Sequence, residues 1–527
     1  MSNKYDVIII GAGHNGLVNA AYLAKSGLKV LVLEKRHLVG GATVTEEMLP
    51  GYKFSVFSYV VSLLRPEIIR DLNLPAHGLK MLPLESTVTP TPDGNYLYRG
   101  PDSHRTYREI AKFSRRDADA YSDYSRTMYF MARAVRYMLG IIPPDPTSWK
   151  FKDLNGLLKL SKHMLGLSKA DFYMLSKLMT MSSADFLEEW FESDPLRSTL
   201  SASGIIGTNL GPRSPGTAYV LLHHYMGEVD GAARAWGFQK GGTGAVAETI
   251  ASSARSFGVD IEVNTGVEQV IVKNDVASGV ILENGNELYA NTIVSCLDPK
   301  MTFLKLVEKG KLPTELTDAI GNFNTIGSSG KVNLALDGLP DLSCLPGRGA
   351  HMRGAISISP NLDYMERAYD DNKYGNFSQH PFMDAIFPSM IDPDMAPPGK
   401  HVMSCFVQYA PYHLAEGTWE EKREAFGDAV VNTLAEYMPN IKDLILHRQA
   451  LSPWDMEQMV GLSQGNIFQG ELSLSQLFFL RPMPGLAQYR TPIKSYYQCG
   501  SGTHPGGGIC GAPGRLSALE ILKDLKR

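Results

Sequence analysis

Three glycines near the start of the chain are spaced to bind a phosphate group. Gly11, Gly13 and Gly16 follow the apolar run 7–10 in the spacing GxGxxG. In such a loop one glycine makes a tight turn, one lets the backbone approach a pyrophosphate, and one lets the next helix pack closely on the strand. The free N–H groups and the positive dipole end of that helix attract phosphate.

The elements around these glycines complete the unit. Residues 7–10 and 30–33 are predicted as strands buried on both faces, and residues 15–26 as the helix between them. Glu34 lies 18 residues after Gly16, where a carboxylate can accept hydrogen bonds from ribose hydroxyls and would repel a 2′-phosphate. Glycines alone are weak evidence of such a site, but strand, glycines, helix, strand and acid together predict a dinucleotide site.

A Gly-Gly pair extends the motif beyond Glu34. This extension resembles the FAD-binding flavoprotein superfamily that includes amine oxidases and carotenoid desaturases. The alternative is a plain turn between two elements. The resemblance implies that a basic residue, Arg36, and the backbone of Gly40 and Gly41 lie along the FAD phosphates and flavin. The expected cofactor-binding residues of this stretch are Lys35, Arg36, Gly40, Gly41, Ala42 and Thr43.

A second glycine-rich loop lies near the C-terminus, between a strand-like stretch and a helix. Its segment 502–509 (GTHPGGGI) resembles the C-terminal motif of phytoene desaturases and related carotenoid dehydrogenases. The resemblance implies that this loop crosses the flavin and that Val267 contacts the adenine region through its backbone. The residues assigned to the loop are Gly500, Gly507, Gly508 and Ile509.

Three further segments resemble one branch of the superfamily, the pyridine nucleotide-disulfide oxidoreductase domain-containing protein 2 group. They are 217–224 (TAYVLLHH), 465–468 (GNIF) and 499–502 (CGSG). The five cysteines form no C-x-x-C pair, and glycines 241, 242 and 244 follow no apparent buried strand, so neither a dithiol site nor a second dinucleotide site is predicted. We therefore expect non-covalent FAD that is reoxidised by oxygen, a quinone or another acceptor.

Two side chains are candidates for chemistry. His504 precedes Pro505 in the flavin loop and could act on the substrate as an acid or base; the alternative is that it hydrogen-bonds the loop into shape. Lys331 lies on a predicted strand, opposite an apolar face. Some amine oxidases of this superfamily hold a comparable lysine that promotes reoxidation by oxygen; the alternative is a surface lysine.

Composition sets the broad class. The chain has 527 residues, 44% of them hydrophobic and 20% charged, which is typical of a soluble globular protein of two domains. A net charge of −4 argues against general nucleic-acid binding, and no His/Cys spacing indicates a metal site. Because the first strand is expected by about Tyr5, we expect no signal or transit peptide and a cytoplasmic location.

The expected fold is α/β (α+β overall). A discontinuous Rossmann-type FAD-binding domain (1–70, 235–300 and 485–527) is combined with a substrate domain of mixed sheet and helices (71–234 and 301–484), like those of amine oxidases and phytoene desaturases. A helical cap is predicted at about 106–200. Within it, residues 157–181 are basic and amphipathic. Such a stretch suits peripheral membrane contact or an ordinary cap with solvated lysines. Oligomerisation stays open.

Two classes of activity follow from the resemblance. The first is an FAD-dependent dehydrogenase or desaturase that takes a hydride from a lipophilic small molecule onto flavin N5. The second is an amine oxidase that releases hydrogen peroxide, which Lys331 favours, although no aromatic cage is evident in the sequence. A flavoprotein with mainly an interaction role is a third alternative.

Overall fold

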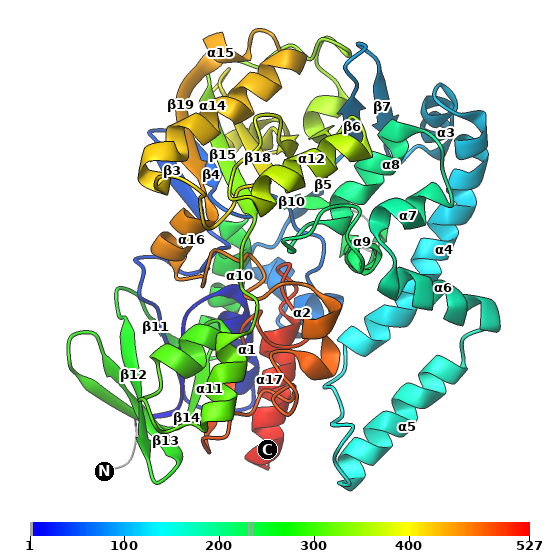
Figure 1. Cartoon of the computed structure of the whole chain (residues 1–527). Helices are drawn as coiled ribbons and strands as arrows, with labels where there is room; N and C mark the ends of the chain where they lie inside the picture. Colours follow the sequence, from blue (N-terminus) through cyan, green and yellow to red (C-terminus); the bar gives the residue numbers. More distant parts are fainter. Residues whose placement is uncertain (1–3, 230–231, 234–235, 527) are drawn as a thin grey trace.

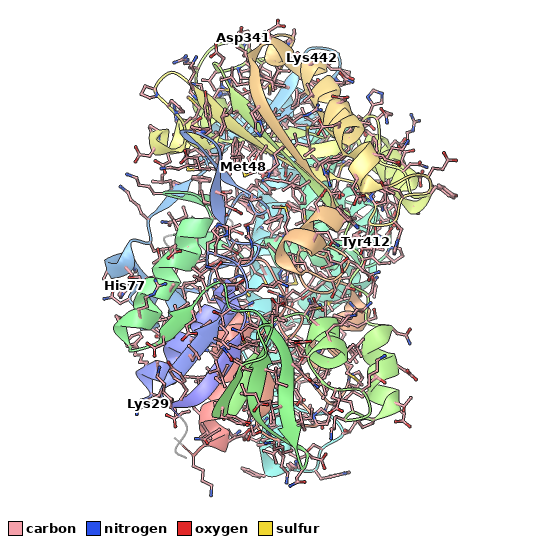
Figure 2. All side chains as sticks on the ribbon, turned by 90° about the vertical axis from the view of Figure 1, so that its left-hand side faces the viewer. Lys29, Met48, His77, Asp341, Tyr412 and Lys442 are labelled. Atoms are coloured by element: carbon pink, nitrogen blue, oxygen red, sulfur yellow. The ribbon has the colours of Figure 1, made fainter. Side chains whose placement is uncertain are left out.

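A computed structural model describes residues 4–229, 232–233 and 236–526. Two seven-stranded sheets form the centres of two lobes (Figure 1). In Figure 2, Lys29 marks the lower lobe, Asp341 and Lys442 mark the far end of the upper lobe, and Met48 and Tyr412 lie between them. The α/β class expected from the sequence is confirmed.

The lower sheet has the order β11-β2-β1-β14-β13-β12, with β20 beside β14. Strands β11, β2, β1, β14 and β20 are parallel, whereas β12, β13 and β14 are antiparallel. All seven come from three distant stretches of chain. Their bounds are β1 Tyr5–Ile10, β2 Val30–Leu33, β11 Asp260–Glu262, β12 Val267–Lys273, β13 Val276–Leu282, β14 Glu287–Ser295 and β20 Tyr496–Gln498.

Three helices cover one face of this sheet. Helix α1 (His14–Lys25) packs between α10 (Gly244–Ser256) and α17 (Ala512–Asp524). Small buried side chains such as Ala20, Ala21 and Ala254 allow the helices to lie close. The prediction of a helix at 15–26 is confirmed to within one residue, because α1 begins at the end of the glycine loop and ends at Lys25.

The upper sheet has the order β19-β15-β18-β17-β16-β6-β7. Helix α14 (Trp419–Tyr437) packs against it and begins with the capping box of Thr418 and Glu421. The strands are β6 Thr87–Pro90, β7 Tyr96–Arg99, β15 Ser329–Leu336, β16 Ala355–Ile358, β17 Phe382–Ile386, β18 His401–Gln408 and β19 Ile445–Leu451. Every residue of β15 and β18 is buried, so these strands form the core of the lobe.

A hairpin from the lower lobe joins the two sheets. Strands β3 (Thr45–Leu49) and β4 (Tyr52–Ser55) reach the upper lobe, where β4 contacts β18 and the Gln449 amide lies 3.6 Å from Met48 Sδ. Figure 2 shows Met48 on this hairpin, beneath the upper sheet. Further connections are α2 Pro66–Asp71, β5 Met81–Pro83, α9 Thr217–His224, β8 Glu228–Val229, β9 Ala232–Ala233, α11 Thr314–Gly321, α12 Leu362–Lys373, α13 Pro388–Ile391, α15 Ile441–Leu444 and α16 Pro453–Val460.

A layer of helices flanks both lobes on one side, and α5 stands apart from the body in Figure 1. The helices are α3 Ser103–Ala111, α4 Arg115–Leu139, α5 Phe151–Leu165, α6 Lys169–Thr180, α7 Ser183–Glu188 and α8 Asp194–Ser201. Among the helices of the described residues, none combines the length and apolar content needed to cross a bilayer.

One expectation about the second glycine cluster was wrong. A buried strand, β10 (Gly237–Gln239), does precede it, but this strand pairs with β5 and lies outside the dinucleotide sheet. The backbone N–H of Gly244, the first residue of α10, donates to Thr45 Oγ1 at 3.0 Å. Because the hairpin occupies this helix N-terminus, it is not open to a phosphate.

Candidate functional site

A cavity of about 430 Å³ extends from the glycine motif of the lower lobe to the underside of the upper sheet. One end is formed by the predicted dinucleotide residues and the other by aromatic and aliphatic side chains. Of the sequence-predicted site residues, those on its wall are Gly11, Gly13, Glu34, Lys35, Arg36, Gly40, Gly41, Ala42, Thr43, Val267, Gly508 and Ile509. Gly16, Gly500, Gly507, Lys331 and His504 are not on the wall.

The absence of Gly16 from the wall has a clear structural reason. A β-carbon at Gly16 would overlap the carbonyl oxygen of Gly11 and lie 3.1 Å from Cys296 Cβ. Gly16 therefore allows α1 to pack closely on the strand ends, the role expected of the third glycine. Gly11 makes the turn, with φ of +91°. The backbone N–H of Gly40 donates to the Ala12 carbonyl oxygen at 2.9 Å and so joins the two glycine segments.

Glu34 is buried and fixed by the backbone. It accepts the Ala12 amide at 2.8 Å and the Arg36 amide at 2.9 Å, one on each carboxylate oxygen. Each oxygen keeps a further acceptor position, so bonding to ribose hydroxyls is compatible with this arrangement. Arg36 pairs with Glu46 at 2.9 Å through Nη2, while its buried Nη1 has no hydrogen-bond partner among the described residues. Lys35 pairs with Glu283 at 2.8 Å at the exposed rim.

The second loop closes over the same cavity. A β-carbon at Gly508 would lie 2.5 Å from Leu63 Cδ1, one at Gly507 would overlap the Phe468 ring, and one at Gly500 would lie 2.5 Å from the Cys296 carbonyl oxygen. The three glycines therefore allow this loop to pack tightly. Ile509 lies on the wall with φ of +56°, which strains a β-branched residue by about 1–3 kcal/mol. Such strain is typical of functional sites.

Arg481 holds this loop in place and was not identified from the sequence. Its guanidinium is fully buried and donates to the carbonyl oxygens of Phe468 (2.9 Å), Gly470 (3.0 Å) and Ser501 (2.9 Å), as well as to those of Glu471 and Gln476. Among the described residues it forms no ion pair. Burial lowers the pKa of Arg481 to about 10, so it remains a cation at neutral pH.

The other end of the cavity is aromatic. Tyr59 and Phe406 stack with ring centroids 5.4 Å apart, and His224 stacks on Trp236 at 5.9 Å and on Phe468 at 6.4 Å. His224 lies on the wall of the cavity. Burial lowers its pKa to about 4, so the imidazole is neutral. Aliphatic residues complete this wall, including Leu63, Ile206, Met456, Met459 and Ile467.

Lys331 lies directly behind this aromatic wall, and the surface-lysine alternative is wrong. The side chain is 0% exposed, its Nζ lies 2.6 Å from Ser404 Oγ, and it lies 5.1 Å from the centroid of the Tyr59 ring. Burial lowers the pKa of Lys331 to about 7. The phenol of Tyr59 donates in turn to the half-buried Asp384 at 3.3 Å, and desolvation raises the pKa of that carboxyl.

His504 lies elsewhere. Its ring is fully buried, packs edge-on against Phe478 at 5.3 Å and faces the backbone at the end of α4, near Met138 and Ile141. Neither ring nitrogen makes a hydrogen bond of normal geometry within the described residues. Burial lowers the pKa of His504 to about 3. This position gives no direct contact with the cavity, and a catalytic role for His504 stays a prediction that the geometry does not favour.

Two residues inside the glycine motif were also missed as site residues. His14 and Asn15 occupy variable positions of GxGxxG, yet both line the cavity at the start of α1. The amide nitrogen of Asn15 donates to Ser501 Oγ at 2.9 Å and so joins the two loops. Their place at a helix N-terminus was a usable signal, because this is where a bound phosphate meets side chains as well as backbone.

Comparison with known proteins identifies the family. The family described as "Flavin containing amine oxidoreductase" matches residues 16–513. The chain belongs to this family. A relative in Rattus norvegicus, "Pyridine nucleotide-disulfide oxidoreductase domain-containing protein 2", is 39% identical over 99% of this chain and 94% of its own. A limonene dehydrogenase component of Castellaniella defragrans is 26% identical over 99% of this chain and 95% of its own.

A solved structure supports the fold. Putrescine oxidase, solved as wild type bound to putrescine, superposes with a TM-score of 0.61 at 16% identity and covers 99% of both chains. The family match and the relatives confirm the resemblance to the amine oxidase and carotenoid desaturase superfamily. The chain is an FAD-dependent oxidoreductase, and its cofactor is FAD.

The residues present fit FAD. The glycine segments leave backbone exposed on both sides of the cavity, with Gly41 close enough that a β-carbon there would lie 3.5 Å from Gly13 Cα. Two buried side-chain nitrogens without partners among the described residues, Arg36 Nη1 and His14 Nε2, are available at the same end. These residues would hold the phosphates, while Glu34 and Val267 would hold the adenosine.

Proposed function

We propose that this flavoenzyme oxidises a lipophilic small molecule by removing a hydride, as a dehydrogenase or desaturase does. The observation that carries the proposal is the aromatic and aliphatic wall opposite the glycine loops. Of the ionisable side chains on that part of the wall, Tyr59 and His224 are neutral at physiological pH because burial raises the pKa of the phenol and lowers that of the imidazole. The third, Glu457, already accepts hydrogen bonds from the Tyr412 hydroxyl and the Gln464 backbone N–H. An apolar substrate would bury its surface there without leaving a charged group unsolvated.

A relative supports this choice of substrate class. The name of the Castellaniella defragrans protein gives limonene, a hydrocarbon, as what it acts on. At 26% identity over nearly the whole chain, this supports an apolar substrate class and no particular compound.

The protein's own part in this chemistry is positioning. FAD supplies the hydride acceptor when bound. The backbone of Gly508 and the strained backbone of Ile509 form one side of the cavity, and the stacked Tyr59 and Phe406 form another. The N-terminus of α17 and the buried cation Arg481 lie behind the loop. Together they give a positive potential on that side, which favours negative charge in the bound ring system.

The test is anaerobic mixing of the FAD-loaded enzyme with separate pools of lipids, terpenoids, amines and NAD(P)H. Reduction is monitored as a loss of flavin absorbance at about 450 nm. The proposal expects bleaching by a lipid or terpenoid pool. Phe406→Asp should abolish that bleaching and keep the flavin spectrum, because it places a carboxylate in the apolar wall. Phe406→Leu is the matched control and should retain it. Bleaching by amines alone would contradict the proposal.

A second candidate, an amine oxidase that uses oxygen, is favoured by one observation. Lys331 is a buried lysine beside the cavity wall, as expected from the resemblance to amine oxidases. If it promotes reoxidation, Lys331→Met should slow the reaction of the reduced enzyme with oxygen and leave anaerobic reduction unchanged. The matched variant Ser404→Ala removes only its 2.6 Å partner and should have the smaller effect. Hydrogen peroxide release with an amine would separate this candidate from the first.

A further inference from the structure

Helix α5 presents an uncovered apolar stripe. Trp149, just before it, is 88% exposed, and Phe151 and Leu165, at its two ends, are each 84% exposed. Leu154 and Leu158 between them are also exposed. The four helical positions 151, 154, 158 and 165 fall at the spacings i, i+3, i+7 and i+14, so they share one face. We call Trp149 and these four residues the α5 face.

The opposite side of α5 is the side attached to the protein. Asp153 is the one fully buried residue of the helix and accepts the Gln488 amide at 2.8 Å. His163 lies 2.8 Å from the Ala134 carbonyl oxygen and stacks on Tyr137 at 4.3 Å. Gly156 packs on Pro144. These contacts fix which side of α5 points outward, and Figure 1 shows the helix standing away from both lobes.

The charge around the α5 face is one-sided. Residues 149–169 contain five lysines and a single acid, the buried Asp153. Lys150, Lys159 and Lys162 are exposed and form no ion pair within the described part of the chain. Lys152 differs, because it pairs with Gln488 and Glu520. Three unpaired cations therefore border a stripe of apolar side chains on a protein whose net charge is −4.

We propose that the α5 face docks on a lipid bilayer that contains anionic phospholipid. An amphipathic helix with aromatic and leucine side chains on one face and lysines beside them lies in the plane of a membrane interface, with its apolar side among the acyl chains. Anionic headgroups attract the lysines. A second copy of the chain fits less well, because two α5 faces packed together would bring Lys159 and Lys162 of each copy against like charges.

The experiment is flotation of the FAD-loaded full-length enzyme with vesicles of phosphatidylcholine, alone or mixed in equal parts with phosphatidylglycerol. We expect binding to the mixed vesicles that weakens as salt is added, since exposed charges are screened. Trp149→Ser/Phe151→Ser/Leu165→Ser should abolish it. Lys150→Glu/Lys159→Glu/Lys162→Glu should weaken it by at least roughly a hundredfold, since each lysine near an anionic surface contributes about a fivefold factor and the glutamates are also repelled.

Matched controls come from exposed residues elsewhere. Tyr374→Ser/Leu446→Ser removes exposed apolar side chains, and Lys309→Glu/Lys311→Glu/Lys422→Glu reverses three exposed lysines, all outside α5. Both controls should bind vesicles as the unaltered protein does. Three results would overturn the proposal: no binding to mixed vesicles, unchanged binding by the α5 variants, or an α5-dependent dimer that does not float. Flotation does not depend on catalysis, so the outcome is separate from that of the proposed function.

Discussion

Replacement of Gly16 by alanine tests the packing at the centre of the cofactor site. The added β-carbon would overlap the Gly11 carbonyl oxygen and approach Cys296 Cβ and Sγ to 3.1 and 3.2 Å. The oxygen belongs to the backbone of the phosphate loop and cannot rotate away as a side chain would. Either α1 moves off the strand ends or the loop deforms, and both changes displace the helix N-terminus.

Two opposing effects set the size of the change. Overpacking of this kind costs about 1–3 kcal/mol. Alanine in a helix gains up to about 1 kcal/mol over glycine. The stability of the apoprotein should therefore fall by no more than about 3 kcal/mol, and by about 2 kcal/mol at most if the helix gain is realised in full. FAD affinity falls by whatever overpacking cost returns when binding restores the original loop geometry, so the full cost of about 3 kcal/mol sets an upper limit of roughly 150-fold.

The assay is titration of apoprotein with FAD, followed by flavin fluorescence. Gly321→Ala is the matched control, because Gly321 is also helical and a β-carbon there meets nothing within 4 Å. This control should bind FAD like the unaltered protein and be equally or more stable. If Gly16→Ala binds FAD within twofold of Gly321→Ala, then close packing of α1 on the strand is not what shapes the site.

Three further predictions concern basic side chains whose nitrogen atoms are buried. Arg36→Met should weaken FAD binding by roughly ten- to a hundredfold, because it removes an unpartnered donor that can form charge-assisted hydrogen bonds; calorimetric titration measures this. Arg481→Lys should lower the melting temperature and the FAD content, because three ammonium donors cannot serve five carbonyl oxygens. In the unaltered protein, Lys331 should raise the free energy of unfolding by about 2 kcal/mol between pH 7 and 9. Lys331→Met should remove this rise, which thermal unfolding at both pH values measures.

The sign of the Lys331 effect follows from its pKa of about 7 in the folded protein. Since a free lysine titrates near 10.4, the unfolded chain binds the extra proton throughout this pH window, and raising the pH favours the folded state. An equal rise in the Met variant would contradict the assignment. Unchanged FAD affinity in Arg36→Met, compared with the control Lys29→Met at an exposed position off the cavity wall, would contradict the role of the orphan guanidinium nitrogen. Full FAD content in Arg481→Lys would contradict the role of Arg481 in holding the C-terminal glycine-rich loop in place.

The local units of this fold were predictable because their signals are local. All parts of the first unit, from its strand through the glycine loop and helix to Glu34, lie within 30 residues. Each residue type in it is required by the local backbone geometry or by the charge of a phosphate. The pairing of β14 with β20 was different. Val294 lies opposite Tyr497, about 200 residues away in sequence, and no periodicity links them. Only the resemblance to known flavoproteins suggested that the two stretches share a domain.

The side chains behind the site were harder to foresee. Alternation along β15 showed that Lys331 and Val332 point to opposite faces, but not that the polar face would also be covered, by Tyr59 and its neighbours. His504 was correctly placed in a glycine-rich loop, yet the sequence could not show which way its ring points. Arg481 has no local pattern, because its carbonyl partners lie in two loops that meet only in the folded chain.

The three-part origin of the lower sheet has a consequence for biosynthesis. Its first strand, β1, leaves the ribosome with one edge unpaired, since its neighbour β14 is synthesised about 280 residues later. The partner of β14, β20, and the helix α17 that packs on α1 come from the last 32 residues. The sheet is therefore complete only after β20 and α17 have been synthesised, and until its strands pair the nascent chain carries an open strand edge that invites non-native pairing.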